Sequence, residues 1–316
     1  MPQPLAEQLH DRGADSSDRA GHLFGTARQL LWVLGLAALV AAGIWMRTLP
    51  AGRLFSADVQ RWPWQTGTTV NLYFVDGAFL FPVSRRLPAN DQLPRAALAA
   101  LLAGPSRSGT LKSTIPRNVE IRSFSVADGV AHIDLSRGLG QGDDERMALT
   151  AITETMTRVP GVRSVALSVK GQSLGARAAR TPLLYFPTAD GLAAVPSSAG
   201  DAHTALAAYL SGPPSREMTG VPSDVRLLAY DYDAADRLLS IGFTYTPAVR
   251  ALALEKPERT RMLLLGLIAS LTEFPEVHAV RLDFGGQSRL GLGECSDLLR
   301  SPQPRPALLN DERLLD

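Results

Sequence analysis

The chain has 316 residues, which is enough for one or two domains of ordinary size. Apolar residues make up 45% and charged residues 20%, the balance of a folded protein with a hydrophobic core. The formal charge of +1 lacks the basic surplus typical of nucleic-acid binding, so we expect no nucleic-acid partner. The only cysteine, Cys295, excludes an intrachain disulfide and a cysteine-rich metal site.

The N-terminal region contains an uncharged apolar run at residues 30–46. A helix of this length spans about 25 Å, the short limit for the hydrocarbon layer of a membrane. Trp32 and Trp45 lie near its ends, where aromatic rings favour the headgroup level. We therefore expect a single-span membrane anchor over 29–47. The alternatives are a buried core helix, which usually has a polar face, and a cleaved signal peptide, which rarely follows so long a leader.

The segments around the folded part are polar or rich in proline. Residues 1–28 predict a flexible tail, and residues 48–67 predict a stalk linker. Residues 295–316 contain three early prolines and predict a C-terminal tail that lies over the surface as a loop or short helix. Three arginines precede the apolar run and three follow it closely, so basic residues alone leave the orientation open.

Alternating apolar residues and turn signals predict the elements of a first unit. The expected strands cover residues 68–75, 78–83, 119–126, 130–135 and 163–169. One expected helix begins at Asn90 or Asp91 and ends at Gly104, and a second begins at Asp143 and ends at Pro160. The order β-α-β-β-α-β predicts an α/β (α+β) domain of two layers, in which two helices pack on one face of a mixed, mostly antiparallel sheet.

The sequence then repeats itself. Four blocks recur in the same order, at offsets of 112, 108, 106 and 115 residues. The equivalent positions include Tyr73 and Tyr185, Gly104 and Gly212, Pro116 and Pro222, and Pro160 and Pro275. Because chance matches do not keep order and spacing together, we expect two tandem domains, over 68–175 and 176–294. In the second, Asp201 is the expected cap of the first helix, and a long helix is expected from Pro257 to Phe274.

The stretch GQSLG at 171–175 fits the nucleophile elbow of hydrolases, with Ser173 as nucleophile. An elbow needs a helix directly after the serine, and the residues that follow do not predict one. The equivalent triplet in the second copy, at 286–288, no longer fits the pattern. We therefore interpret GQS as the turn that ends the last strand of each unit, and a hydrolase using Ser173 remains a remote alternative.

The repeated motifs resemble a known family. They are LYFVDGAFLFPVSR, ALLAGPSRSGTLKSTIPRNVEIRSFSVADGVAHIDLS and TRVPGVRSVALSVKGQS, which together resemble the GerMN domain of sporulation and spore germination proteins. The second copy is a weaker relative, with Ser197 near the place of Arg85 and Gly242 at the place of Asp134. The resemblance implies domains similar to ring-building modules, no catalytic residue and no cofactor. It also implies a single-pass protein of the cell membrane whose two domains lie outside the cytoplasm and whose tail at residues 1–28 is cytoplasmic.

Candidate binding sites are few. The five histidines show no metal-ligand spacing, and no glycine motif predicts a phosphate site, so we expect no metal, no cofactor and no small-molecule substrate. Arg85 and Arg86 are the candidate interaction residues, with a solvated loop as the alternative. The expected partners are the membrane, through residues 30–46, and either further copies of the chain or other envelope proteins.

The expected function follows from these features. We predict a membrane-anchored, non-enzymatic envelope protein that acts as a structural or assembly component in sporulation or spore germination. The alternative is an accessory component of a cell-envelope signalling or secretion complex outside sporulation.

Overall fold

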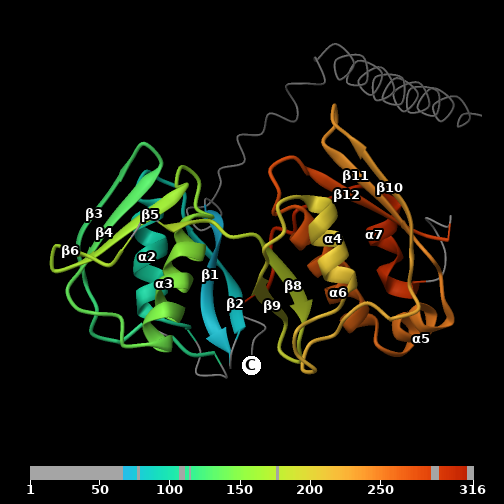
Figure 1. Ribbon diagram of the computed structural model, residues 1–316, viewed down its shortest axis with the longest axis horizontal. Helices are drawn as coiled ribbons and strands as arrows, with labels where there is room; N and C mark the ends of the chain where they lie inside the picture. Colours follow the sequence, from blue (N-terminus) through green and yellow to red (C-terminus); the bar gives the residue numbers. More distant parts are fainter. Residues whose placement is uncertain are drawn as a thin grey trace, which may run out of the picture. The chain divides into compact units, whose positions relative to one another are not determined.

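The computed structural model describes residues 67–76, 79–106, 111–113, 115–175, 178–285 and 292–311 (Figure 1). Thr66–Asp316 form one compact unit. The expected tail at 1–28, the expected anchor and the expected stalk lie outside the described residues, except for Gly67, which begins β1. Within the described part of the chain, no helix is long and apolar enough to cross a membrane.

The first repeat follows the expected order of elements. It consists of β1 (Gly67–Asp76), β2 (Phe79–Pro88), α2 (Leu93–Ala103), β3 (Ile121–Ala127), β4 (Val130–Leu135), α3 (Asp143–Met156), β5 (Ser164–Val169), β6 (Gln172–Ser173) and β7 (Ala178–Ala179). Gly104 ends α2 as predicted, with a φ of 84° and an amide that donates to the carbonyl of Leu101. A positive φ favours glycine, since a Cβ is strained there.

The second repeat adds one helix to this plan. It consists of β8 (Leu183–Pro187), β9 (Leu192–Pro196), α4 (Ala202–Leu210), β10 (Leu227–Asp233), β11 (Leu238–Phe243), α5 (Pro247–Glu255), α6 (Pro257–Leu271) and β12 (Ala279–Phe284). Asp201 caps α4 in a reciprocal capping box with Thr204, as expected. The sequence analysis did not predict α5, which begins where the side chain of Thr246 accepts the amide of Val249.

Each repeat has its own outer sheet of mixed direction. In the first, β3 pairs antiparallel with β4, and β4 pairs parallel with β5. In the second, β10, β11 and β12 repeat this arrangement, and β13 (Gln303–Pro304) adds a further strand. The predicted α/β (α+β) class with two tandem domains is confirmed.

We expected the opening hairpin of each repeat to lie in the same sheet as the other strands of that repeat, and this expectation is wrong. β1 and β2 join β8 and β9 in one central sheet of order β1-β2-β9-β8 (Figure 1). Leu72 and Phe74 on one face of β1 pack in the main core, whereas Tyr73 and Val75 on the other face pack in a second core shared by both repeats. Because both faces are apolar, the hairpin needs a cover on each side, which one layer of helices does not supply.

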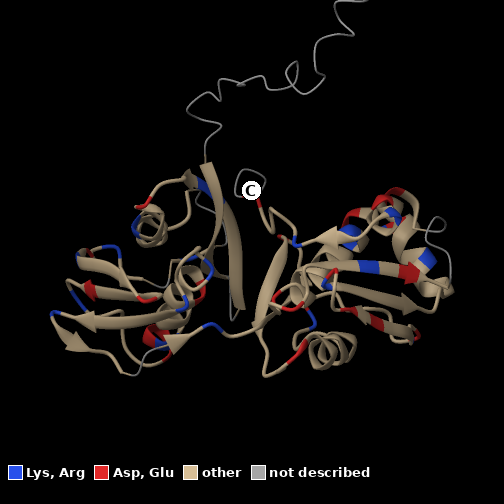
Figure 2. Cartoon of the chain, turned by 90° about the horizontal axis from the view of Figure 1, so that it is seen from above, with Lys and Arg blue, Asp and Glu red and all other residues tan. Residues whose placement is uncertain are grey.

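Helices cover the outer edges of this central sheet. The amide of Tyr73 in β1 donates to Thr155 Oγ1 of α3 at 3.0 Å. The amide of Tyr185 in β8 donates to Ser270 Oγ of α6 at 2.8 Å. These hydroxyl groups satisfy backbone donors that would otherwise be buried without a partner. Figure 2, turned by 90° from Figure 1, shows the two hairpins side by side between the repeats.

The C-terminal segment lies partly inside the fold instead of over the surface. β2 and β9 pair at Leu80 and Ala194, and Asn310 then bridges the two strands. Its amide nitrogen donates to the carbonyls of Pro82 and Leu192, at 2.6 and 2.9 Å, and its oxygen accepts the amide of Leu192 at 2.8 Å. This part of the C-terminal segment is buried because it satisfies backbone groups of β2 and β9 at positions where the two strands do not pair with one another.

Candidate functional site

The largest group of buried charges in the described residues lies between the two repeats. Its members come from β1, β8, α3, the turns that follow α3 and α6, the segment between the repeats and the C-terminal segment. They are Tyr73, Glu154, Arg158, Arg180, Tyr185, Glu273 and Arg305. We call these seven residues the inter-repeat network. The side chain of Glu273 is fully buried, and those of Glu154 and Arg158 are 2% and 6% exposed. Charges as deeply buried as these need partners, because burial without pairing is costly.

Glu273 is the centre of the network. Arg158 donates to Glu273 Oε2 at 2.8 Å, and Arg180 donates to the same oxygen at 2.6 Å. Arg305 donates to Oε1 at 2.5 Å. Burial by itself raises the pKa of Glu273, but the three guanidinium groups outweigh burial and lower the pKa to about 2. The carboxylate is therefore ionised throughout the neutral range and is fully occupied by internal partners.

The two tyrosines form a hydrogen-bond chain with a fixed direction. The hydroxyl of Tyr185 donates to Glu273 Oε1 at 2.8 Å, because an ionised carboxylate only accepts. The hydroxyl of Tyr73 lies 2.9 Å from that of Tyr185 and must therefore be the donor of the pair. Burial raises the pKa of both tyrosines, so both stay protonated.

Arginines also cover the tyrosine rings. The guanidinium of Arg158 lies 5.0 Å from the ring centre of Tyr73, and that of Arg305 lies 5.6 Å from the ring centre of Tyr185. Both distances are within the range of cation–π contacts. Each repeat therefore contributes one tyrosine, and each tyrosine is held by one arginine.

Glu154 completes the network on the side of the first repeat. It forms an ion pair with Arg158, one helical turn further on, and its other oxygen accepts the amide of Thr181 at 3.3 Å. Burial raises the pKa of Glu154, although Arg158 partly opposes this effect. The network as a whole joins the two repeats and the segment between them, and its acids and bases already bind one another.

Sequence reasoning missed this network, although a signal was present. Arg158 and Glu273 are 115 residues apart, the same offset that relates Pro160 to Pro275. Residues of opposite charge at equivalent positions of two repeats are expected where the repeats face one another. The sequence alone did not show that these positions meet.

The expected interaction residues lie on β2. Arg85 donates to the carbonyls of Ala100 and Gly104, at 3.3 and 3.2 Å, and so binds the C-terminal end of α2, where a positive charge is favourable. Arg86 donates to the carbonyl of Gly67 at 3.4 Å. The structure does not bring them together with the inter-repeat network, and their role in partner binding stays a prediction.

The GQS triplet forms a hairpin and does not lead into a helix. Lys170 and Gly171 have φ values of 49° and 81° and form the turn between β5 and β6. Ser173 is exposed, and its hydroxyl donates to the carbonyl of Gly175 at 3.0 Å. This geometry agrees with the interpretation of the triplet as a turn. The equivalent triplet at 286–288 lies outside the described residues.

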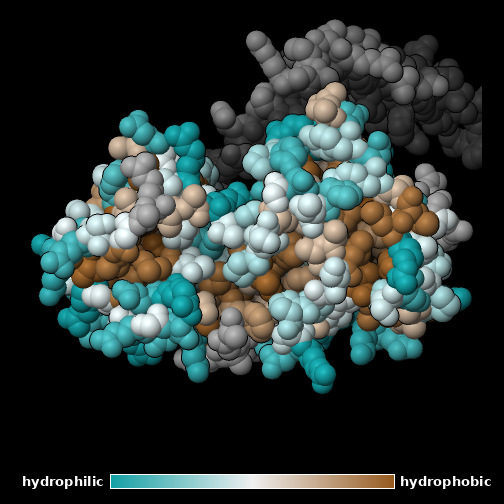
Figure 3. All heavy atoms as spheres, viewed as in Figure 1, coloured by the Kyte–Doolittle hydropathy of each residue, from teal (hydrophilic) through white to brown (hydrophobic). Residues whose placement is uncertain are grey.

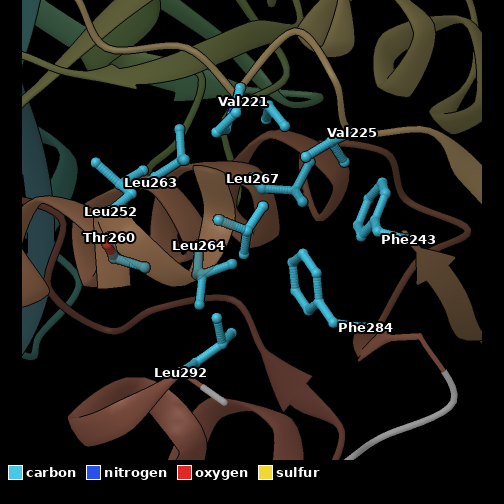
Figure 4. A pocket seen from close by; sticks show the side chains of 12 residues that line it. Val221, Val225, Phe243, Leu252, Thr260, Leu263, Leu264, Leu267, Phe284 and Leu292 are labelled. Atoms are coloured by element: carbon cyan, nitrogen blue, oxygen red, sulfur yellow. The ribbon is translucent and has the colours of Figure 1, made fainter. Parts of the chain in front are cut away.

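The core of the second repeat contains a small apolar cavity of about 30 Å³ (Figure 4). Its lining includes Leu264 and Leu267 of α6 and the rings of Phe243 and Phe284, whose centres are 5.4 Å apart. A cavity of this size has room for about one water molecule, but a water needs two or more polar partners. The hydroxyl of Thr260, the polar side chain in the lining, donates to the carbonyl of Lys256. We interpret the cavity as a packing void.

Two shallow grooves flank Phe79, near the junction of β2 and β9. One, of about 280 Å³, is lined by Asp143, Arg146 and Met147 among others, and the second, of about 270 Å³, by Asp190 and Glu217 among others. None of the network residues lines either groove. Within the described residues, no group of three or more histidine, cysteine, aspartate or glutamate side chains is placed to hold a metal ion.

The family model named Germane, described as sporulation and spore germination, matches residues 71–175 and again 183–289. The chain belongs to this family. The resemblance to GerMN domains, stated from the sequence motifs, is thereby confirmed, and so is the tandem arrangement. The comparison with curated proteins gave no match.

Among solved structures, this Germane-family chain is similar to the tandem GerMN domains of the sporulation protein GerM from Bacillus subtilis. The TM-score is 0.58 and the identity 17%, over 78% of this chain and 99% of that chain. At this identity the match shows the fold alone. A putative lipoprotein from Clostridium perfringens has a TM-score of 0.27 and 24% identity over 36% of this chain and 88% of its own. Its score is too low to carry an argument.

Proposed function

We propose that this protein is a membrane-anchored, non-enzymatic component of the bacterial envelope that takes part in the assembly of a larger structure during sporulation or spore germination. Its family is one of sporulation and spore germination proteins. The proposed anchor is the apolar run at residues 30–46, and the proposed location of both repeats is the outer side of the membrane, as the family resemblance implies.

The observation that carries this proposal is the position of the unpaired sheet edges. The opening hairpins of the two repeats pair with one another in the central sheet. In contrast, β3 and β10 are terminal strands of the outer sheets. Val126 at the end of β3 is 40% exposed and Leu228 in β10 is 60% exposed. Figure 3 shows that apolar residues reach the surface over both repeats on one face. Free strand edges with apolar side chains are ready sites for contact with another chain.

Charge also differs between the repeats. Residues 66–175 contain 12 basic and 9 acidic side chains, and residues 176–294 contain 11 and 13. The opposite signs favour head-to-tail packing of neighbouring molecules. A contact of this kind generates a ring when its rotation closes.

The test is a pair of edge variants, Val126→Lys and Leu228→Lys, in the full chain. A lysine on an edge strand opposes pairing with a further strand. Leu254→Lys is the matched control, because Leu254 lies in α5 and is 61% exposed. We expect the edge variants to lower the mass of the assembled chain in native mass spectrometry and to reduce the yield of heat-resistant spores in the source bacterium. Full assembly and full spore yield in both edge variants contradict the proposal.

The second candidate function is an accessory role in envelope signalling or secretion outside sporulation. It shares the fold and the anchor and differs in timing, so a time course of expression separates the two. Appearance only after starvation supports the sporulation role. Constant expression during growth supports the second candidate.

The remote alternative, a hydrolase that uses Ser173, requires an activated serine. The hydroxyl of Ser173 contacts the backbone of its own turn. Substitution Ser173→Ala is expected to leave assembly and spore yield unchanged.

A further inference from the structure

The two repeats meet through the same surface of each. In the central sheet, β2 pairs with β9 and the order β1-β2-β9-β8 reads the same from either end when equivalent strands are exchanged. Tyr73 contacts its own equivalent, Tyr185, and Arg158 contacts its own equivalent, Glu273. This is the geometry of an isologous interface, in which a residue near the symmetry axis faces the same position of the partner.

Such an interface between two identical repeats would place identical residues opposite one another. Two first repeats would bring Arg158 against a second Arg158 in a buried site, since the side chain is 6% exposed. The tyrosine chain would also lose its final acceptor, since Tyr73 would face another Tyr73 and no carboxylate would stand at the position of Glu273. Glu154 does not replace it, because its oxygens already bind Arg158 and the amide of Thr181.

We infer that the inter-repeat surface of the first repeat selects a second repeat as its partner and rejects another first repeat. The selecting pair is Arg158 and Glu273, joined at 2.8 Å, and the tyrosine chain that ends on Glu273 makes the choice directional. Buried ion pairs often contribute little net stability, so a role in the choice of partner is their better-supported use. The partner is a second repeat, either of the same chain or of another copy.

The apolar part of the interface does not make this distinction by itself. Leu80 and Tyr73 of the first repeat have Leu192 and Tyr185 as their equivalents, at the offset of 112 residues, and all four lie in the shared core. Met147 and Met262 are likewise equivalent and pack against the same core. These apolar contacts are nearly the same for any pair of repeats. The choice of partner repeat therefore depends on the charged and hydrogen-bonded residues of the inter-repeat network.

The test uses two full-length variants, alone and mixed. Glu273→Arg sets an arginine against three others and leaves the first repeat unchanged. Arg158→Glu sets a carboxylate against Glu273 and leaves the second repeat unchanged. Each variant alone is expected to show no association beyond that of the parent chain. After mixing, the intact first repeat of one and the intact second repeat of the other are expected to form a 1:1 dimer, at least tenfold more abundant than in either separate sample by native mass spectrometry.

Two results overturn the inference. One is dimerisation of the Glu273→Arg chain by itself as readily as in the mixture, which means that a first repeat accepts another first repeat. The other is a mixture that contains no more dimer than the two separate samples. Arg261→Glu is the matched control, because Arg261 and its partner Asp297 are 40% and 49% exposed and lie outside the interface. It is expected to give no dimer with either variant.

A charge reversal in a buried site can prevent folding, so a milder pair is measured in parallel. Arg158→Met and Glu273→Gln keep the side-chain size and remove one charge each. With this pair, a mixed dimer in excess of both separate samples supports selection by the network. Equal amounts of dimer in all three samples, or none in any, contradict it.

Discussion

Tyr73 and Tyr185 occupy the same position of the two repeats, and their hydroxyl groups lie 2.9 Å apart in the core that both repeats share. The pair is symmetric in the backbone, since each amide binds a hydroxyl of the neighbouring helix. It is asymmetric in hydrogen bonding, because only Tyr185 donates directly to Glu273. One charged residue in the second repeat therefore gives two equivalent tyrosines different roles.

This asymmetry predicts different effects for the two tyrosine-to-phenylalanine substitutions. Tyr73→Phe removes one donor from the hydroxyl of Tyr185, which keeps its bonds to Glu273 and Arg305. We expect a loss of about 1 kcal/mol in the free energy of unfolding. Tyr185→Phe also leaves the hydroxyl of Tyr73 buried without an acceptor, and we expect a loss of about 2–4 kcal/mol. Urea unfolding of both variants measures the difference. Equal losses of unfolding free energy in the two variants would show that the inferred direction of the hydrogen bonds from Tyr73 through Tyr185 to Glu273 is wrong.

The low pKa of Glu273 predicts a loss of stability in acid. The folded-state pKa is about 2, below the ordinary value of 4.5, so the ionised form stabilises the fold above pH 4.5. This contribution is lost as the pH falls from about 5 to about 2, and its size is on the order of 3 kcal/mol. The pH dependence of urea unfolding, with Glu273→Gln for comparison, measures it. The variant is expected to be less stable at pH 7 and to lack this part of the acid dependence.

Glu154 works in the opposite direction. Its pKa is raised in the folded state, mainly by burial, so its ionisation above pH 4.5 opposes folding. We therefore expect Glu154→Gln to make stability fall more steeply toward acid than in the parent chain, because the compensating group is gone. If the dependence of stability on pH were the same in this variant as in the parent chain, the raised pKa of Glu154 would be contradicted.

Local sequence signals were sufficient for most of the individual elements. The cap at Asp201 and the helix stop at Gly104 each depend on residues within a few positions of one another, and both were expected. The class and the tandem repeat followed from the order of such elements. The missed helix α5 also has a local signal, Thr246 followed by Pro247, but the equivalent region of the first repeat contains no such pair.

The placement of the hairpins and the C-terminal segment depends on long-range contacts that no local pattern contains. The five buried residues of β8 read as a buried strand, yet their alternation does not identify the strand beside them. The amide of Leu309 donates to Ser84 Oγ, and the side chain of Asn310 accepts the amide of Leu192, in both cases from more than 100 residues away in the sequence. The local pattern of this proline-rich segment gives no sign of such burial.

Gly266 marks a close approach of α6 to β8 that the sequence did not reveal. A Cβ at this position would collide with the carbonyl oxygen of Tyr185, which is backbone and cannot move aside freely. We expect Gly266→Ala to destabilise the protein by about 1–3 kcal/mol, although alanine favours helices. Gly200→Ala is the control, since nothing lies within 4 Å of a Cβ there. Thermal unfolding of both variants provides the measurement, and equal melting temperatures would show that α6 and β8 are not in close contact.

Asn310 provides the last prediction, because one side chain satisfies three backbone groups of both repeats. Asn310→Ala leaves the carbonyls of Pro82 and Leu192 and the amide of Leu192 buried without partners. Since each such loss costs roughly 1–3 kcal/mol, we expect a total of several kcal/mol and faster hydrogen exchange at the amide of Leu192. Leu308→Ala is the matched control, because the neighbouring Leu308 is 47% exposed.

Asn310→Asp separates the two halves of this contact. The carboxylate keeps an acceptor for the amide of Leu192 but has no donor for the carbonyls of Pro82 and Leu192. If Asn310 joins the strands as the structure indicates, Asn310→Asp destabilises the protein as much as Asn310→Ala or more, because a charge is then buried beside two carbonyl oxygens. A stability close to that of the parent chain would mean that the C-terminal segment is not held between β2 and β9.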